Sequence, residues 1–172
     1  MPALEQSPVH AFEPAVQALA LALRTRGWRL VTAESCTGGL IAAACTAVAG
    51  SSDWLEGGLV TYSNDAKTRW LGVPAALIQA HGAVSENVAL AMAQGALDHS
   101  SADLAVAVTG IAGPGGAVPG KPVGTVWLAW GTRGALHAQR LQLPGNRDAV
   151  RAGTVHAALQ CLLQTTMHGT PT

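Results

Sequence analysis

The segment WRLVTAESCTGGLIAAACTAV, residues 28–48, decides the fold class of this chain. Residues 28–33 are mostly apolar and predict a buried strand, and the small apolar residues 40–48 predict a helix. Between them the polar, glycine-containing residues 34–39 predict a tight turn. A strand that passes through a tight turn into a helix is the building unit of an α/β protein.

The elements on either side continue this alternation. Gly27 and the break at 72–74 end helices, while Ser85 and Asn146 have side chains suited to helix N-caps. We expect helices over 12–26, 63–71, 85–97 and 147–167, strands over 59–62 and 103–109, and a hairpin of strands over 123–130 and 135–143. This order predicts an α/β fold with a mixed sheet flanked by helices on both faces, in a single layered α/β/α domain.

The composition is typical of one folded domain, and we expect this domain to span residues 1–172. We expect residues 1–10 and 169–172 to be flexible tails. Hydrophobic residues make up 49% of the chain and charged residues 12%, so there is ample material for a core. Ten basic and ten acidic side chains balance, which leaves no electrostatic footprint for nucleic acid. Because so few residues are charged, we expect apolar surface that is covered in a homo-oligomer.

Cysteine usage and apolar patterning predict a cytoplasmic protein. Three cysteines are an odd number without paired short spacing, and the chain starts without a signal-peptide pattern. The apolar stretches 40–49 and 104–108 are much shorter than the ~20 residues that cross a bilayer. We therefore expect no membrane span.

The glycine- and proline-rich segment 110–122 predicts a long loop, and its composition imitates a phosphate-binding motif. Residues 115–121 match the P-loop spacing, but Pro122 stands where that motif has Ser or Thr, and a strand follows instead of a helix. The glycine spacing also differs from the dinucleotide-binding fingerprint. ATP hydrolysis and redox chemistry are therefore not expected.

The histidines show no spacing typical of metal ligands, such as an i, i+4 pair beside a carboxylate. The sequence thus predicts neither a metal nor a cofactor. The six histidines are His10, His81, His99, His137, His156 and His168.

Ser35 lies in the turn after the first strand, at the sheet edge where α/β proteins bind ligands. Nearby backbone N–H groups are suited to stabilise an oxyanion if the hydroxyl acts as a nucleophile. In the plainer alternative, Ser35 or Thr37 only caps the following helix. Cys36 is a further candidate nucleophile, with burial as a small apolar residue as its alternative.

A serine nucleophile needs a base, and the sequence has no Gly-x-Ser-x-Gly motif with a plausible histidine partner. Lysine serves as a base only if burial or a nearby cation lowers its pKa from about 10.4. Lys67 lies beside apolar residues at the start of an expected helix. The alternative is a solvated lysine paired with Asp65 or another acid.

Five motifs follow one another along the chain: TAESCTGG at 32–39, VTYSNDAK at 60–67, HGAVSE at 81–86, GIAGP at 110–114 and KPVGTVW at 121–127. Taken together they resemble the CinA C-terminal domain family, and the resemblance extends from the first expected helix to Arg151. One difference is Thr109, where the family commonly has serine.

This resemblance implies hydrolysis of nicotinamide mononucleotide to nicotinic acid mononucleotide and ammonia, without metal or organic cofactor. It makes Ser35 the nucleophile and Lys67 the base, while Tyr62 positions or relays the proton. The alternative is a nucleotide-binding module, related to competence or DNA damage, that has no catalytic activity.

The expected substrate contacts come from the matched motifs and from one arginine. The turn at 109–113 suits an oxyanion or a phosphate through its backbone N–H groups. Arg147 is a candidate phosphate anchor, with an ion pair to Asp148 or to the surface of the last helix as the alternative. The expected substrate-binding residues are Thr37, Gly38, Asn64, Thr109, Gly110, Ile111, Ala112, Gly113 and Arg147.

Overall fold

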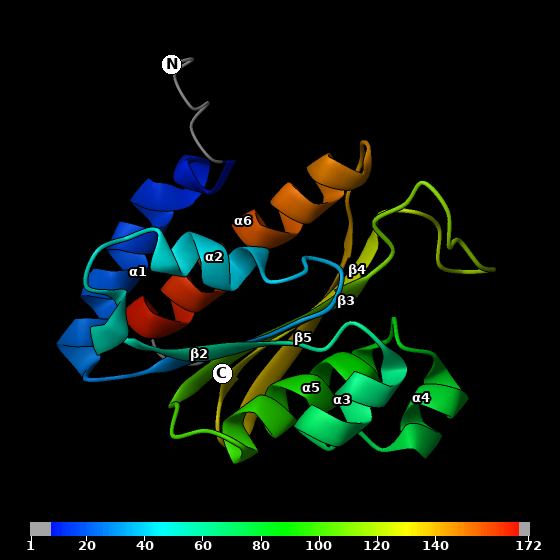
Figure 1. Cartoon of the computed structure of the whole chain (residues 1–172), viewed down its shortest axis with the longest axis horizontal. Coiled ribbons are helices and arrows are strands. Elements are labelled where there is room, and N and C mark those ends of the chain that lie inside the picture. The colour runs from blue at the N-terminus through cyan, green and yellow to red at the C-terminus, as the bar shows by residue number, and fades with distance from the viewer. Residues whose placement is uncertain (1–7, 169–172) are drawn as a thin grey trace, which may run out of the picture.

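The computed structural model describes residues 8–168, coloured by position along the chain in Figure 1. Its helices and strands alternate as expected. In chain order they are the 3-10 helix η1 (Pro8–Phe12), α1 (Glu13–Arg26), β1 (Leu30–Glu34), α2 (Leu40–Thr46), the 3-10 helix η2 (Ser51–Asp53), β2 (Leu55–Val60), α3 (Asn64–Leu71), α4 (Ala75–His81), α5 (Glu86–Asp98), β3 (Leu104–Gly110), β4 (Thr125–Thr132), β5 (Ala135–Gln142) and α6 (Arg147–His168).

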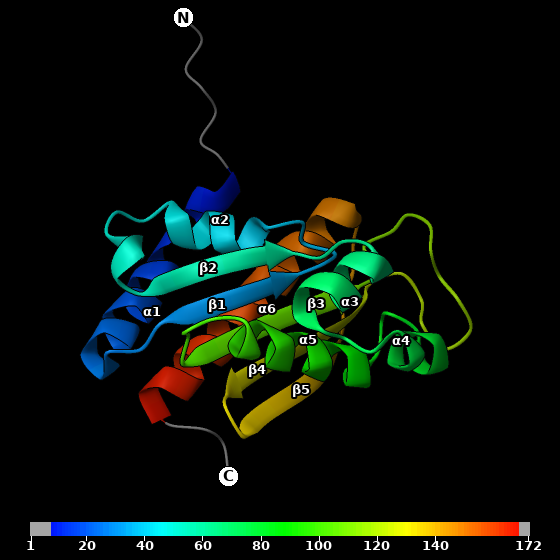
Figure 2. The same cartoon turned by 60° about the horizontal axis from the view of Figure 1, so that its bottom comes forward.

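The strands form a five-stranded mixed sheet in the order β2-β1-β3-β4-β5. β1 pairs in parallel with β2 and with β3, whereas β4 pairs antiparallel with β3 and with β5. Helices α1, α2 and α6 cover one face, and α3, α4 and α5 lie on the other (Figures 1 and 2). The predicted α/β/α architecture and the antiparallel hairpin are therefore confirmed.

The core consists of two layers separated by the sheet, and β3 contributes to both. Val106 and Val108 pack into the cluster beneath α1, α2 and α6, while Ala105 and Ala107 face the cluster beneath α5. This alternation follows from the two-residue period of a strand. Gly95 of α5 has no side chain because a Cβ there would lie 1.9 Å from the carbonyl oxygen of Leu71, so α3 and α5 pack in close contact.

Two expectations about individual elements were wrong. The strand expected over 59–62 spans Leu55–Val60, with Gly57 and Gly58 inside it. A Cβ on Gly58 would lie 2.9 Å from the Cβ of Ala42, so this glycine allows α2 to pack on the strand. Helix α4, Ala75–His81, was not expected because Pro74 was interpreted as a chain break, whereas it is the N-cap residue of that helix.

The tails expected at 1–10 and 169–172 fall mostly outside the described residues. Residues 1–7 and 169–172 are not described, and 8–10 belong to η1. The N-cap roles of Ser85 and Asn146 are confirmed, since their side chains accept hydrogen bonds from Val88 N and Ala149 N. Within residues 8–168, no helix combines the length and apolar character that crossing a membrane requires.

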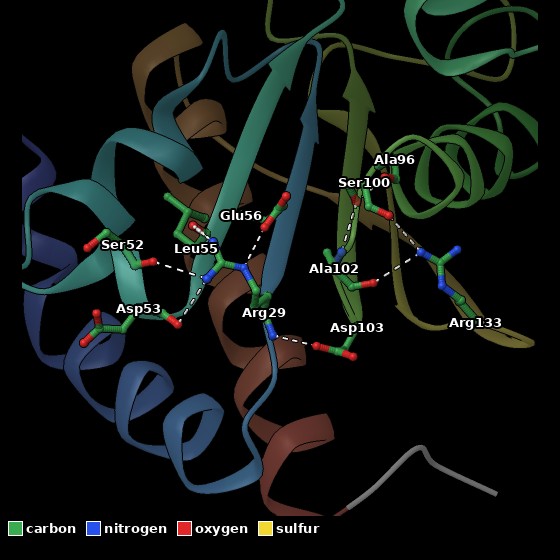
Figure 3. A network of polar contacts seen from close by, with 10 residues as sticks. All are labelled: Arg29, Ser52, Asp53, Leu55, Glu56, Ala96, Ser100, Ala102, Asp103 and Arg133. Carbon is green, nitrogen blue, oxygen red and sulfur yellow. Dashed lines mark hydrogen bonds and ion pairs between the residues drawn. The ribbon is translucent and has the colours of Figure 1, made fainter.

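A polar network closes the amino-terminal edge of the sheet (Figure 3). The side chain of Arg29 donates to Glu56 at 2.6 Å and to the carbonyl oxygens of Ser52, Asp53 and Leu55. Its backbone N–H donates at 2.8 Å to the side chain of Asp103, the residue that precedes β3. These contacts join the starts of three parallel strands, so the functional loops extend from the opposite, carboxyl-terminal edge.

Candidate active site

The connections that leave the carboxyl ends of β1, β2 and β3 meet around a pocket of about 240 Å³. Ligands of open α/β sheets bind at this edge. The pocket is lined by Ser35, Cys36, Tyr62, Asn64, Lys67, Ala83, Val84, Thr109, Gly110, Ala112 and Arg147.

Ser35 is the first residue after β1, and its side chain faces the pocket. Its N–H donates to Val108 O at 3.0 Å, which continues the pairing of β1 with β3 by one residue. Ser35 as a whole residue is 9% exposed, so its side chain is largely shielded from solvent. Gly39 is the N-cap residue of α2, so the alternative in which Ser35 or Thr37 caps this helix is wrong.

Lys67 comes from the first turn of α3, whose N-cap Ser63 accepts a hydrogen bond from Ala66 N. The residue is 1% exposed, and its Nζ lies 2.9 Å from Ser35 Oγ. Asp65 instead pairs with Arg69 on the surface at 3.0 Å. The alternative of a solvated Lys67 paired with Asp65 is therefore wrong.

Burial makes the neutral amine of Lys67 easier to form than that of a solvated lysine. Nζ donates to Thr61 O at 2.7 Å and to Tyr62 O at 3.2 Å, in addition to its contact with Ser35. Burial lowers the pKa of Lys67 from 10.5 to about 8, and a smaller effect of Cys36 opposes this shift. A neutral amine has two N–H groups for the two carbonyls and a lone pair that can accept the Ser35 proton.

The thiol of Cys36 lines the same pocket but is poorly suited to act as the nucleophile. Burial raises its pKa from 9.0 to about 11, so almost all of it is protonated at neutral pH. The geometry thus favours Ser35 over Cys36, and Cys36 forms part of the pocket wall.

Tyr62 and Arg147 lie together at the pocket rim. Tyr62 is 60% exposed, and its hydroxyl accepts a hydrogen bond from Arg147 Nη2 at 3.1 Å, while its carbonyl oxygen holds Lys67. Arg147 Nη1 also donates to Gly113 O at 2.8 Å. Arg147 and Asp148 form no ion pair within residues 8–168. Arg147 thus joins three segments at the mouth of the pocket.

Four predicted binding residues do not line this pocket. The hydroxyl of Thr37 donates to buried Glu34, and Gly38 lies in the turn behind Ser35. Ile111 is buried. Its N–H donates to Thr125 O, and its carbonyl oxygen accepts a hydrogen bond from Gly124 N. Gly113 reaches the rim only through the carbonyl oxygen that Arg147 contacts. The predicted residues that do line the pocket are Ser35, Tyr62, Asn64, Lys67, Thr109, Gly110, Ala112 and Arg147.

Sequence reasoning missed the pocket wall formed by Ala83 and Val84. The hydroxyl of Thr109 donates to Ala83 O at 2.9 Å, which ties this segment to the end of β3. The motif at 81–86 was the available signal, but Ala83 and Val84 themselves carry no reactive group that marks them as part of a site. Glu34 was also missed, because a charged residue at a strand end is usually exposed.

The chain is thus an α/β protein with a pocket built around a buried serine–lysine pair, and comparison with known proteins identifies its family. The model of the CinA C-terminal domain matches residues 13–166. The chain belongs to this family.

Two kinds of curated relatives match the chain. It is 57% identical to the nicotinamide-nucleotide amidohydrolase PncC of Pseudomonas putida over 83% of this chain and 89% of that protein. Its identity to the Escherichia coli protein of the same name is 51%, covering 87% and 91%. A CinA-like protein of Citrifermentans bemidjiense is 58% identical over 84% of this chain, which spans only 35% of that longer protein.

Solved structures agree with the fold described above. A CinA superfamily protein from Klebsiella pneumoniae superimposes with a TM-score of 0.88 at 42% identity, covering 94% of this chain and 99% of that one. The corresponding Escherichia coli protein gives a TM-score of 0.87 at 37% identity, with 94% of both chains covered.

Proposed function

We propose that this chain is an amidohydrolase that converts nicotinamide mononucleotide to nicotinic acid mononucleotide and ammonia, with Ser35 as nucleophile and Lys67 as base. The observation that carries the proposal is the 2.9 Å contact between Lys67 Nζ and Ser35 Oγ inside a pocket. Relatives named for this activity, matched over most of both chains, support the choice of substrate.

In the first half of the reaction, neutral Lys67 takes the hydroxyl proton of Ser35, and Oγ attacks the carboxamide carbon. The turn at 109–113 lines the pocket through Gly110 and Ala112, and it is the proposed site for the developing oxyanion. The ammonium of Lys67 then donates its proton to the departing nitrogen. The C–N bond breaks, ammonia leaves and an ester to Ser35 remains.

In the second half, water attacks this ester while Lys67 accepts a proton from the water. The C–O bond to Ser35 breaks, Oγ recovers its proton from Lys67, and the carboxylic acid product leaves. Every proton transfer uses the same nitrogen, so no further acid or base is needed. The carbonyl oxygen of Tyr62 accepts a hydrogen bond from Lys67 and orients it, and the Tyr62 hydroxyl accepts one from Arg147.

The substrate phosphate is assigned to Arg147 at the mouth of the pocket. A guanidinium group binds phosphate through two parallel hydrogen bonds, and Nη1 and Nη2 here are directed to neutral oxygens that a phosphate can replace. Asn64 lines the pocket beside Lys67 and offers its amide to the substrate.

The test is ammonia release from nicotinamide mononucleotide by the purified chain, with nicotinic acid mononucleotide identified as the product. Ser35→Ala should abolish turnover, whereas the control Ser52→Ala, at the opposite edge of the sheet, should keep it. Binding of the nucleotide by a folded wild-type chain without turnover would instead support the nucleotide-binding module.

We further propose that the chain forms a homo-oligomer in the cytoplasm. Large apolar side chains are exposed on both faces of the sheet, Leu21 and Met167 on α1 and α6 and Trp70 on α3, which favours contacts between copies, and all three cysteines are free. Light scattering coupled to size exclusion should give a mass of at least two chains, and a monomer mass would contradict the proposal.

A further inference from the structure

Glu34, which directly precedes Ser35, is a fully buried carboxylate that the proposed reaction does not use. Its two oxygens accept hydrogen bonds from the hydroxyl of Thr37, from Ile41 N and Ala42 N at 2.9 Å each, and from the hydroxyl of Thr32 at 3.3 Å. A buried carboxylate is stable only when it is paired or well hydrogen-bonded, and here the first N–H groups of α2 and two hydroxyls supply the partners.

The contacts of Glu34 enclose the nucleophile turn. Its carboxylate reaches forward to Thr37 and to the start of α2, so residues 35–39 are held as a closed loop across it. The loop is tightened by Gly38 N, which donates to Ser35 O at 3.0 Å, and by Arg151, whose Nη2 donates to Thr37 O at 3.1 Å. The turn that carries Ser35 is therefore held from inside the protein and from α6.

The backbone of Glu34 also connects with the base. Its carbonyl oxygen accepts a hydrogen bond from Thr61 N at 2.9 Å, and the carbonyl oxygen of Thr61 accepts one from Lys67 Nζ at 2.7 Å. The backbone at Glu34 thus connects the turn of Ser35 to the segment that holds Lys67. Glu34 itself is absent from the pocket lining, so it is not placed to transfer protons to the substrate.

We infer that Glu34 and Thr37 are positioning residues that keep Ser35 Oγ within hydrogen-bond distance of Lys67 Nζ. This inference rests on the proposed serine–lysine mechanism and deepens it. A misplacement of a reacting group by about 1 Å costs on the order of a hundredfold in rate, so loss of the loop contacts should appear in catalysis before binding.

Substitutions can separate the hydroxyl contact from the volume of the side chain. Thr37→Val keeps the shape but removes the donor to Glu34, whereas Thr37→Ser keeps the donor. Glu34→Gln turns an amide NH₂ group toward one backbone N–H group and one hydroxyl, because each carboxylate oxygen accepts from one of each.

The matched control is Glu56→Gln. Glu56 is a partly buried carboxylate whose Oε2 lies 2.6 Å from Arg29 Nε in an ion pair, and Figure 3 shows the pair at the amino-terminal edge of the sheet. Its replacement should lower the melting temperature without changing catalysis. A loss of activity that is due only to lower stability would therefore also appear in Glu56→Gln.

The experiment measures kcat and KM for nicotinamide mononucleotide and the rate at which a fluorophosphonate labels Ser35, for the wild-type chain and all four variants. Thr37→Val and Glu34→Gln should lower kcat and the labelling rate at least about tenfold, with KM within about twofold of the wild type. Thr37→Ser and Glu56→Gln should stay within about threefold of the wild type in both rates.

Three results would overturn the inference: equal rates for Thr37→Val and Thr37→Ser, a loss confined to KM, or an equal loss in Glu56→Gln. The labelling rate tests the positioning role of Glu34 and Thr37 separately from the proposed substrate. A wild-type chain that is labelled at Ser35 but does not hydrolyse nicotinamide mononucleotide would contradict the proposed substrate, and the labelling rates of the variants would still decide the inference.

Discussion

Lys67 Nζ lies 2.9 Å from Ser35 Oγ although 32 positions separate the two residues in the chain. β1 and β2 are neighbouring parallel strands, and their register pairs Glu34 with Val60, so both strands end at the same level. The residue that follows β1 and the helix that follows β2 are thereby brought to the same pocket.

Activity should depend on the neutral form of Lys67. Because burial lowers the pKa of Lys67 to about 8, kcat/KM for nicotinamide mononucleotide should rise with pH and level off above about 8. Initial rates of ammonia release between pH 6 and 10 measure this profile. Activity that is independent of pH over this range, in a chain that stays folded, would argue against Lys67 as the base.

Lys67→Met should abolish turnover and change how stability depends on pH. The folded pKa of about 8 lies below the usual 10.5, so the unfolded chain holds this proton more tightly and wild-type stability should rise between pH 8 and 10.5. Burial of the charged ammonium therefore lowers the free energy of unfolding by about 3 kcal/mol at pH 7, and this penalty vanishes above pH 10.5. Methionine carries no such penalty, while the two lost carbonyl contacts cost the same at each pH.

Urea unfolding of both proteins at pH 7 and pH 10 measures this effect. The variant should gain about 2–3 kcal/mol relative to the wild type when the pH is lowered from 10 to 7. An equal difference in unfolding free energy at both pH values would mean that Lys67 titrates as an ordinary lysine.

Cys36→Ala should remain active. Burial raises the pKa of this thiol to about 11, so the proposed reaction does not depend on it and the variant loses only part of the pocket wall. We expect kcat within about threefold of the wild type and slow alkylation of Cys36 by iodoacetamide at pH 7. Loss of turnover in the folded variant, together with rapid inactivation of the wild type by iodoacetamide, would favour a cysteine nucleophile.

Arg147→Gln should weaken the binding of a phosphorylated substrate. Charge-assisted hydrogen bonds contribute about 1.5–3 kcal/mol, so KM for nicotinamide mononucleotide should rise about tenfold or more, and KM for nicotinamide riboside should change little. Arg69→Gln is the control, since this exposed arginine pairs only with surface Asp65 among the described ion pairs. Equal effects of Arg147→Gln on both substrates would place the phosphate elsewhere.

Much of the fold was predictable because its signals are local. The strand–turn–helix unit at 28–48, the caps at Ser85 and Asn146 and the hairpin turn at 133–134 are encoded by neighbouring residues. β2 was misplaced for the opposite reason. Gly57 and Gly58 disfavour a strand when considered alone. The packing of α2 explains Gly58, whereas nothing in the structure explains Gly57, where a Cβ would meet no atom within 4 Å.

The candidate site was predictable only in part, and the reason lies in long-range contacts. Ser35 and Lys67 were identified from their motifs, and Arg147 from its chemistry. The roles of Thr37 and Glu34 depend on which donors surround a buried carboxylate after folding. Ala83 and Val84 line the pocket because of their position, and their side chains have no functional group that marks them.

The sequence by itself determined the order of the elements apart from α4, the caps of two helices and the presence of a serine and a lysine after two strands. Periodicity and turn chemistry act over a few neighbouring residues, so they can be read without the fold. Only the tertiary structure decided that Lys67 is 1% exposed, lies on Ser35 and has a lowered pKa. Desolvation and contact geometry arise when distant segments pack together, and desolvation is what lowers the pKa of this lysine.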